Sequence, residues 1–155
     1  MTQREQQLNG FLVTVFNDIL RLEEASLRRS CDNLSVTELH VLDAIAAASG
    51  SGSPPTMADL AAKVGVTGGT MTVAVKTLEQ KGYALRARDE RDKRRVGVRL
   101  TQAAAPVLAA HDAFHKALVR RACGRLDEAQ TAALCTALAD LHTFFTSNDC
   151  KGENV

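Results

Sequence analysis

A helix, a turn, a second helix and a stretch with a two-residue period follow one another between residues 56 and 100. Thr56 is placed to cap the first helix, and Gly65 supplies the tight turn. Thr67 is placed to cap the second helix, which Gly82 ends. Apolar and basic residues then alternate, which predicts a two-stranded hairpin. This order predicts a winged helix–turn–helix and leaves few other folds open to the chain.

The predicted hairpin is strongly basic, although the net charge of the whole chain is only +1. Residues 86–99 hold seven Lys and Arg against three acids, a local charge of +4, and the rest of the chain holds twelve bases against fifteen acids. Apolar and basic side chains alternate along both strands, so we expect one cationic face and one apolar face turned inward. The apolar residues are Leu85, Ala87, Val96, Val98 and Leu100. A basic surface on a slightly acidic body is typical of proteins that bind phosphate groups.

Four further helices are expected around this unit. Apolar residues at steps of three and four predict a helix over residues 5–30, and Ser35 with Glu38 forms a capping box for the next one. Thr101 is placed to cap a long helix, which should start late or kink near Pro106, and Gly124 ends it. The last helix is capped by Asp127 and Gln130. The predicted fold is mainly α, with a small β-hairpin wing.

The chain therefore reads as one domain over residues 1–146, with a flexible tail at 147–155. The DNA-binding winged helix–turn–helix covers about 35–101, and long helices flank it at about 5–31 and 102–146. These outer helices are apolar along one face and would expose it in a single copy. We expect them to form a homodimer, which would present two recognition helices about one DNA turn apart to a pseudo-palindromic operator.

Candidate DNA contacts lie at the start of the second helix of the motif and on the hairpin. The N-terminal residues of a recognition helix meet base edges in the major groove, and its amides favour phosphate oxygens. Basic residues of the wing would reach the flanking backbone or the minor groove. Asp92 stands two residues before Arg94 and could hold its guanidinium in place. The candidate contacts are Thr67, Gly68, Gly69, Thr70, Thr72, Lys76, Arg88, Arg91, Lys93, Arg94 and Arg95.

Several other classes of protein are disfavoured. No apolar run is long enough for a membrane span, and the N-terminal residues MTQREQQLNG do not resemble a signal peptide, so we expect a cytoplasmic protein. The four cysteines lack CxxC spacing and are expected to be free thiols. The sequence contains no nucleophile elbow, phosphate-binding loop or complete metal motif, so we expect no enzyme activity.

The segment TGGTMTVAVKTLEQKGYALRARDERDKRRVGVRLT resembles the MarR family of transcription regulators. It contains a Thr-started recognition helix, an LExKG pattern, a D-x-R wing motif at Asp92–Arg94 and a closing LT. The resemblance extends from about residue 8 to 146. It implies a dimeric regulator that binds double-stranded DNA.

Four segments are similar to the members of this family that repress fatty-acid biosynthesis genes: FNDILRLEEASLRRS, LSVTELHVLDAI, GTMTVAVKTLEQKGY and HDAFHKALV. That resemblance implies a co-repressor, acyl carrier protein (ACP) carrying a long acyl chain. The chain would enter an apolar cavity between the dimerisation helices and the DNA-binding unit. Candidate lining residues, which could equally be ordinary core or a polar network, are Phe16, Leu20, Leu27, Leu39, His40, His111, Phe114 and His115.

Two alternatives remain open at the histidines and at one cysteine. His111 and His115 are one helical turn apart, a spacing that can hold one metal ion. With His40 and Glu24 they resemble the ligands of zinc-responsive relatives, which carry a carboxylate where this chain has Leu39. The adjacent Glu23 could also reach these histidines. The second alternative is a redox sensor at Cys31, beside two arginines that could lower its pKa.

Overall fold

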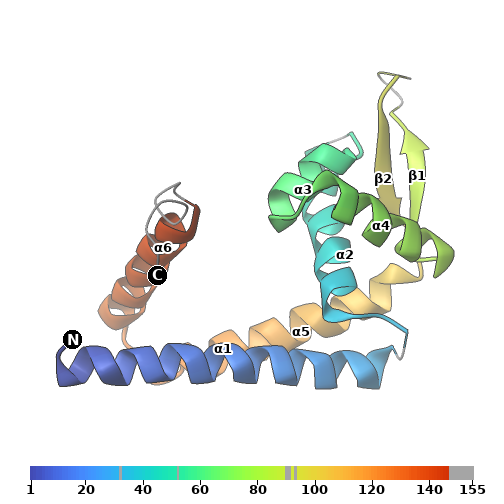
Figure 1. Cartoon of the computed structure of the whole chain (residues 1–155). Coiled ribbons are helices and arrows are strands. Elements are labelled where there is room, and N and C mark those ends of the chain that lie inside the picture. The colour runs from blue at the N-terminus through green and yellow to red at the C-terminus, as the bar shows by residue number, and fades with distance from the viewer. Residues whose placement is uncertain (32, 52, 90–91, 93, 147–155) are drawn as a thin grey trace. The chain divides into compact units, whose positions relative to one another are not determined.

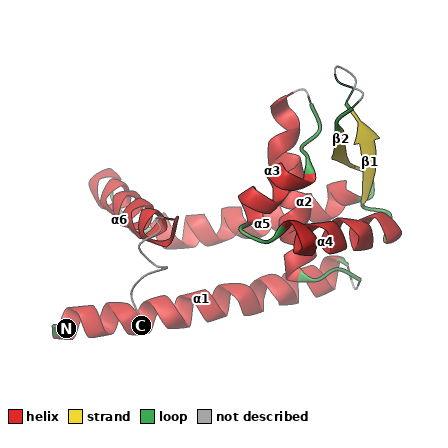
Figure 2. Ribbon diagram, turned by 45° about the horizontal axis from the view of Figure 1, so that its top comes forward, coloured by secondary structure: helices red, strands yellow, loops and turns green. Residues whose placement is uncertain are grey.

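The computed structural model describes residues 1–146 except 32, 52, 90–91 and 93. The chain divides into two compact units, Met1–Phe114 and His115–Val155, and each is described by itself. The elements, in chain order, are α1 (Gln3–Ser30), α2 (Val36–Ala48), a 3-10 turn (Ser49–Ser51), α3 (Met57–Val64), α4 (Gly68–Gln80), β1 (Ala84–Arg88), β2 (Val96–Leu100), α5 (Ala104–Cys123) and α6 (Glu128–Thr146). Figure 2 shows that helices dominate and that the two strands form one hairpin. None of the described helices is both long and apolar enough to cross a membrane.

The helix starts are set by local capping. Capping boxes join Ser35 to Glu38 at α2 and Thr56 to Asp59 at α3, as predicted. The Thr67 hydroxyl accepts a hydrogen bond from the amide of Thr70 at the start of α4. α5 begins at Ala104, so its start is late as expected, but Thr101 does not cap it, because the Thr101 hydroxyl donates to the carbonyl of Gly82 at 2.6 Å. Asp127 and Gln130 exchange hydrogen bonds ahead of α6.

The core of the first unit lies between α2, α3, α4 and the hairpin (Figure 1). Met71, Val75 and Leu78 form the inward face of α4, as their spacing predicts, and each is fully buried. They pack in the same cluster as the α2 and α3 residues Leu42, Ile45 and Leu60. The recognition helix is thus held along one side, and the opposite side stays exposed.

The pairing of the hairpin contradicts the expected division into an apolar and a cationic face. The register places Arg86 opposite Val98 and Leu85 opposite Arg99. Directly opposite residues of an antiparallel pair point to the same side, so each face mixes apolar and basic residues. Val98 is buried as expected, whereas Leu85 and Val96 are exposed. The expected two-stranded hairpin forms, but the burial of its side chains does not follow the expected alternation.

The hairpin is fixed to the body at β2. The amide of Val98 donates to the carbonyl of Pro55, at 2.9 Å, so the Pro-Pro segment lies along the strand. A Cβ atom added to Gly97 would come within 2.5 Å of the Pro54 carbonyl oxygen. Glycine is therefore required at position 97 by the close approach of this backbone.

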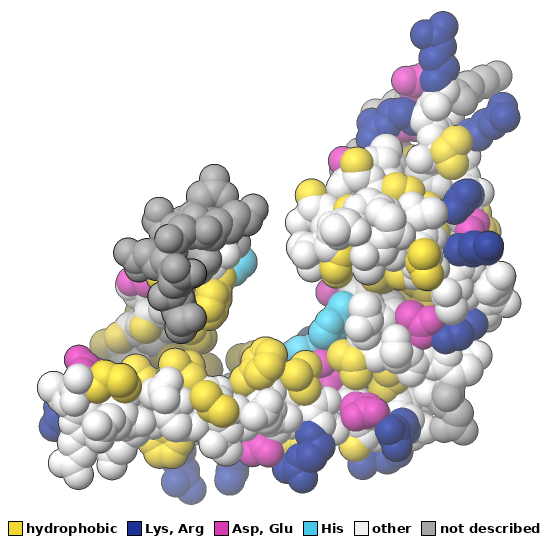
Figure 3. Space-filling view, viewed as in Figure 1, with side chains coloured by type: hydrophobic (Ala, Val, Ile, Leu, Met, Phe, Trp, Pro, Cys, Tyr) yellow, Lys and Arg dark blue, Asp and Glu magenta, His cyan; other side chains and the backbone are white. Residues whose placement is uncertain are grey.

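The N-terminal half of α1 leaves large apolar side chains in solvent. Leu8, Phe11, Val15 and Phe16 are all exposed, and Figure 3 shows yellow hydrophobic side chains along this helix. In the second unit, α6 likewise exposes Leu134, Leu138, Phe144 and Phe145. Contiguous exposed apolar surface of this kind marks an interaction site.

Candidate nucleic-acid interface and effector cavity

The start of α4 is an open surface. Thr67, Gly68, Gly69, Thr70, Thr72 and Lys76 are all exposed. A Cβ added at Gly68 would meet no atom within 4 Å, and one at Gly69 would meet only the Thr67 hydroxyl at 3.9 Å. The chain's own packing therefore does not require these two glycines, which leaves room for close approach by a ligand. The Thr72 hydroxyl donates to the carbonyl of Gly68 at 2.8 Å, so it is partly engaged within the helix.

Val73 is a candidate contact that the sequence analysis did not include. It lies on the exposed side of α4 and its relative exposure is 66 %. Apolar side chains in the major groove contact the methyl group of thymine. The signal was present in the sequence, because Val73 falls outside the face formed by Met71, Val75 and Leu78.

The wing presents Arg88 and Arg94 to solvent, and no described acid forms an ion pair with either (Figure 3 shows basic side chains at this end in dark blue). Asp92 does not act as expected. Its carboxylate accepts a hydrogen bond from the backbone amide of Arg94 at 3.0 Å, so it shapes the turn and does not hold the guanidinium. Arg91 and Lys93 lie outside the described residues.

Arg95 is directed back to the body of the unit. Its guanidinium lies 3.4 Å from a carboxylate oxygen of Asp59, the capping residue of α3. The backbone and hydroxyl hydrogen bonds from Thr56, with a smaller contribution from Arg95, lower the pKa of Asp59. Arg95 therefore ties the wing to α3, whereas Arg88 and Arg94 make no such link.

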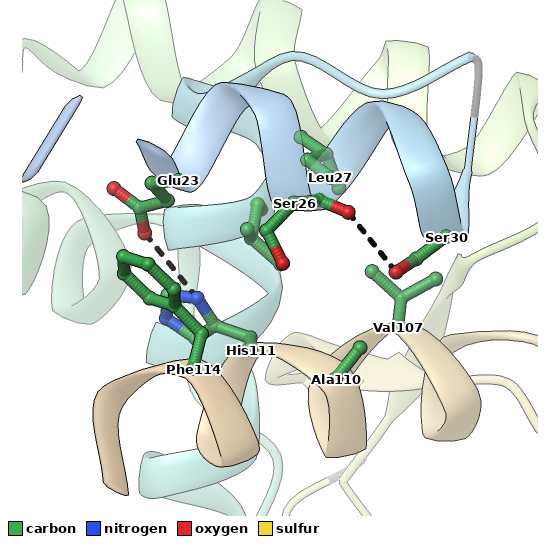
Figure 4. Close-up of a pocket in the computed structure, with 9 residues that line it drawn as sticks. Glu23, Ser26, Leu27, Ser30, Val107, Ala110, His111 and Phe114 are labelled. Carbon is green, nitrogen blue, oxygen red and sulfur yellow. Dashed lines mark hydrogen bonds and ion pairs between the residues drawn. The ribbon is translucent and has the colours of Figure 1, made fainter. Parts of the chain in front are cut away.

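A small buried cavity lies where α1, α2 and the first part of α5 meet. Figure 4 shows α1 residues, Glu23 and Leu27 among them, facing α5 residues such as Val107, His111 and Phe114. The cavity leaves about 10 Å³, room for at most one water molecule. Leu39, Leu27 and His111 are thus brought together as expected, in a space that is almost filled.

One carboxylate contacts two histidines beside this cavity. A side-chain oxygen of Glu23 lies 2.9 Å from Nε2 of His40 and 3.2 Å from Nδ1 of His111. Glu23 is only 3 % exposed. Glu24, the carboxylate named with these histidines from the sequence, instead forms an exposed ion pair with Arg28 at 2.7 Å. Glu23 takes the place expected for Glu24.

The remaining effector candidates do not line this small cavity. Leu20, Leu27 and His40 line an open groove of about 1060 Å³ between α1 and the start of α2, together with Arg28 and Lys81. Phe16 lines neither space and is 62 % exposed. His115 begins the second unit, where it borders a hollow with Lys116, Val119 and Arg120.

Cys31 is the residue that ends α1. Its sulfur lies 2.8 Å from the hydroxyl of Tyr83 and 2.8 Å from the side-chain oxygen of Asn33. The contact with Cys31 and partial burial raise the pKa of Tyr83. Cys123 and Cys135 are free thiols, as is Cys31, and Cys150 lies outside the described residues. The end of α1 is thereby fastened to the residue that precedes β1.

A second link of this kind joins Lys81 to Glu38, and the sequence analysis assigned it no role. The ammonium of Lys81 lies 2.8 Å from both carboxylate oxygens of Glu38. Burial acts to raise the pKa of Glu38, but the hydrogen bonds from Lys81 and from the amide of Ser35 outweigh it and leave that pKa lowered. The two residues are far apart in sequence, so no local pattern indicates their contact.

Comparison with known proteins supports the interpretation of the fold and of DNA as the partner. A model of the MarR family matches residues 32–95. The structure of Streptococcus pneumoniae FabT in complex with DNA is similar over 91 % of this chain and 96 % of that one, with 33 % identity and a TM-score of 0.79. The Staphylococcus aureus MepR–DNA complex covers 88 % and 94 %, at 18 % identity and a TM-score of 0.74. For the regulator BldR of Sulfolobus solfataricus the values are 92 % and 99 %, at 25 % identity and a TM-score of 0.64.

No protein with a curated description matches the chain. The identity to FabT extends over nearly the whole length of both chains, and the helix–turn–helix, the wing and the flanking helices all have counterparts in the expected order. Such proteins act by binding DNA and not by catalysis. The chain belongs to the MarR family of DNA-binding transcription regulators.

Proposed function

We propose that this protein is a homodimeric, cytoplasmic repressor of fatty-acid biosynthesis genes, with long-chain acyl-ACP as its co-repressor. The observation that carries the proposal is the 33 % identity to FabT, which extends over 91 % of this chain. FabT itself was crystallised with DNA. The expected target is a pseudo-palindromic operator that is read by two copies of α4 and two wings.

The homodimer is supported by the exposed apolar side chains of α1. Phe11 and Phe16 are more than half exposed, and aromatic side chains of this size dominate the energetics of protein interfaces. A second copy of the chain would cover them. Dimerisation would also supply the second recognition helix that a palindrome requires.

The acyl group has two candidate locations. The cavity beside His111 holds about 10 Å³, far below the roughly 300–1,000 Å³ of ordinary ligand pockets, so an acyl chain would enter only if the helices part. The open groove beside Leu20 and Leu27 has about 1060 Å³ and needs no such movement. The apolar part of its lining, Leu20, Leu27, Leu34 and Val36, suits an acyl chain. We favour the groove as the entrance and the cavity as the inner end of the same site.

A zinc-responsive regulator is the second candidate, because Glu23, His40 and His111 converge. One carboxylate and two imidazoles are donors that zinc accepts, and one oxygen of Glu23 lies 2.9 Å from His40 and 3.2 Å from His111. In the apo protein the same contacts form a network in which the buried Glu23 faces two histidines. This network is sufficient to explain the burial of Glu23 without a metal ion.

One experiment separates these functions. An operator duplex is first selected with the wild-type protein from a randomised library. Its affinity is then measured with long-chain acyl-ACP, with zinc, with peroxide and without addition. Tightening by acyl-ACP alone supports the proposal, and tightening by zinc that is lost in His40→Ala supports the second candidate. A response to peroxide that is lost in Cys31→Ser would reject both in favour of a redox sensor.

A further inference from the structure

The ion pair between Lys81 and Glu38 connects the C-terminal end of α4 with the N-terminal end of α2. Lys81 is the C-cap residue of α4, directly after the last turn of the recognition helix. Glu38 lies in the first turn of α2, where it also accepts a hydrogen bond from the amide of Ser35. The pair therefore ties the end of one helix to the start of another.

This pair differs from the surface ion pairs of the same unit. The side chains of Lys81 and Glu38 are 27 % and 11 % exposed, against 74 % and 55 % for Arg28 and Glu24. Lys81 donates to both oxygens of the carboxylate, at 2.8 Å each. Charged hydrogen bonds that are shielded from water are stronger and more costly to break than exposed ones. The contact between Lys81 and Glu38 therefore holds the end of α4 firmly against the start of α2.

The Lys81–Glu38 ion pair lies at the opposite end of α4 from the residues that would read DNA. α4 has 13 residues, so its two ends are roughly 20 Å apart. The inner face of α4 is packed into the core by Met71, Val75 and Leu78. These residues hold the helix along one side only. A tilt of roughly 5° about the C-terminal end would move Gly68 and Gly69 by roughly 1.7 Å, given the rise of an α-helix. Base readout requires closer placement than that.

We infer that Lys81 and Glu38 are positioning residues for operator recognition, whose ion pair fixes the tilt of α4 against α2. Neither residue contacts DNA in this role. Loss of the pair therefore reduces the affinity for the operator and leaves the binding of unrelated DNA unchanged, because non-specific binding depends on phosphate contacts and tolerates a tilt.

The test measures the affinity of the full-length protein for the selected operator and for a scrambled duplex of the same composition. The variants are Lys81→Met, Glu38→Gln and the double variant. Glutamine keeps the capping box at α2 and removes only the charge. Each single variant is expected to lower operator affinity about ten-fold, with less than two-fold change on scrambled DNA, and the double variant is expected to be no worse than either. Lys81→Arg should restore most of the affinity.

Glu38→Gln separates this role from a direct phosphate contact. If Lys81 bound phosphate, freeing it from Glu38 would leave operator affinity unchanged or raise it, and that result overturns the inference. A parallel loss on both duplexes in Lys81→Met, or a shallower salt dependence, overturns it as well. Arg29→Met, which removes an exposed cation from α1, is the matched control and should change neither affinity nor melting temperature. A lowered melting temperature with an unchanged ratio of the two affinities would make the pair merely structural.

Discussion

Apolar side chains are treated differently in two regions of the molecule. They are buried in the region from α2 to β2 and exposed on the N-terminal half of α1. The first region completes its core within one chain, and Leu42, Ile45, Met71 and Leu78 are fully buried there. The second keeps Phe11 and other large side chains in solvent. The difference indicates that the DNA-reading part needs no partner to complete its core, whereas the exposed apolar surface of α1 fits the proposed homodimer.

The largest expected effect comes from placing charges on the exposed apolar surface of α1. In Phe11→Glu/Phe16→Glu, buried charges would prevent the two copies from associating, so the protein should sediment as a monomer. Operator affinity should fall by more than about 100-fold, because the two half-sites are no longer bound by linked modules. Gln6→Glu, an exposed polar change on the opposite side of the same helix, should leave both properties unchanged. A double variant that stays dimeric would show that α1 does not form the interface.

A second variant tests whether the stability of the region from α2 to β2 depends on the packing of β2 against Pro54. In Gly97→Val the new side chain would overlap Pro54, whose oxygen lies 2.5 Å from the position of a Cβ. The free energy of unfolding should fall by about 2–3 kcal/mol, as for overpacked interiors. Chemical denaturation measures the loss. Gly50→Ala, where a Cβ meets nothing within 4 Å, should change it by less than about 0.5 kcal/mol. Equal stability of both variants would contradict the close packing of β2 against Pro54.

The wing then offers a smaller change that leaves the fold intact. Arg94→Ala removes an exposed cation without an ion pair among the described residues, so stability should stay the same. Operator affinity should fall about ten-fold and the salt slope by about one ion, as for one phosphate contact. Arg95→Ala should lower operator affinity less, because its guanidinium faces Asp59. A loss of operator affinity in Arg95→Ala that equals or exceeds the loss in Arg94→Ala would contradict this prediction.

The smallest expected effect concerns pH. The pKa of Glu38 is lower in the folded chain than its ordinary value of 4.5. Its carboxylate therefore stabilises the fold above pH 4.5, and this contribution is lost as the pH falls through the lowered value. Wild type should exceed Glu38→Gln in stability by on the order of 1 kcal/mol at pH 7, and the difference should vanish in acid. A difference that is independent of pH would rule out the ionised pair as its source.

Features that depend on neighbouring residues were predictable from the sequence. The capping boxes at Ser35 and Thr56 and the inward face of α4 need only a few residues of context, and all were confirmed. The pairing of the hairpin was not predictable in this way. Its register depends on how β2 sits against Pro54 and Pro55, and a shift by one residue exchanges the faces.

The candidate site also combines features that the local sequence indicates with features that only the tertiary structure shows. The sequence brought His40 and His111 together through the resemblance and offered both Glu24 and Glu23 as the carboxylate, of which the structure places Glu23 beside the histidines. Glu23 is four residues from both Ile19 and Leu27, so its place on the inner side of α1 could have been read from the helical period. The contact between Lys81 and Glu38 gave no such signal, because only the packed tertiary structure makes them neighbours.

The Pro54–Pro55 segment has a consequence for how the protein meets other chains. It accepts the amide of Val98 but carries no amide hydrogens of its own, since proline has none. A foreign strand that approached this side of the hairpin would find an edge already occupied and no donor beyond it. A strand of another chain is thus prevented from extending the hairpin into a continuous sheet at this edge. The sequence achieves this with two prolines, residues that neither a helix interior nor a central strand tolerates.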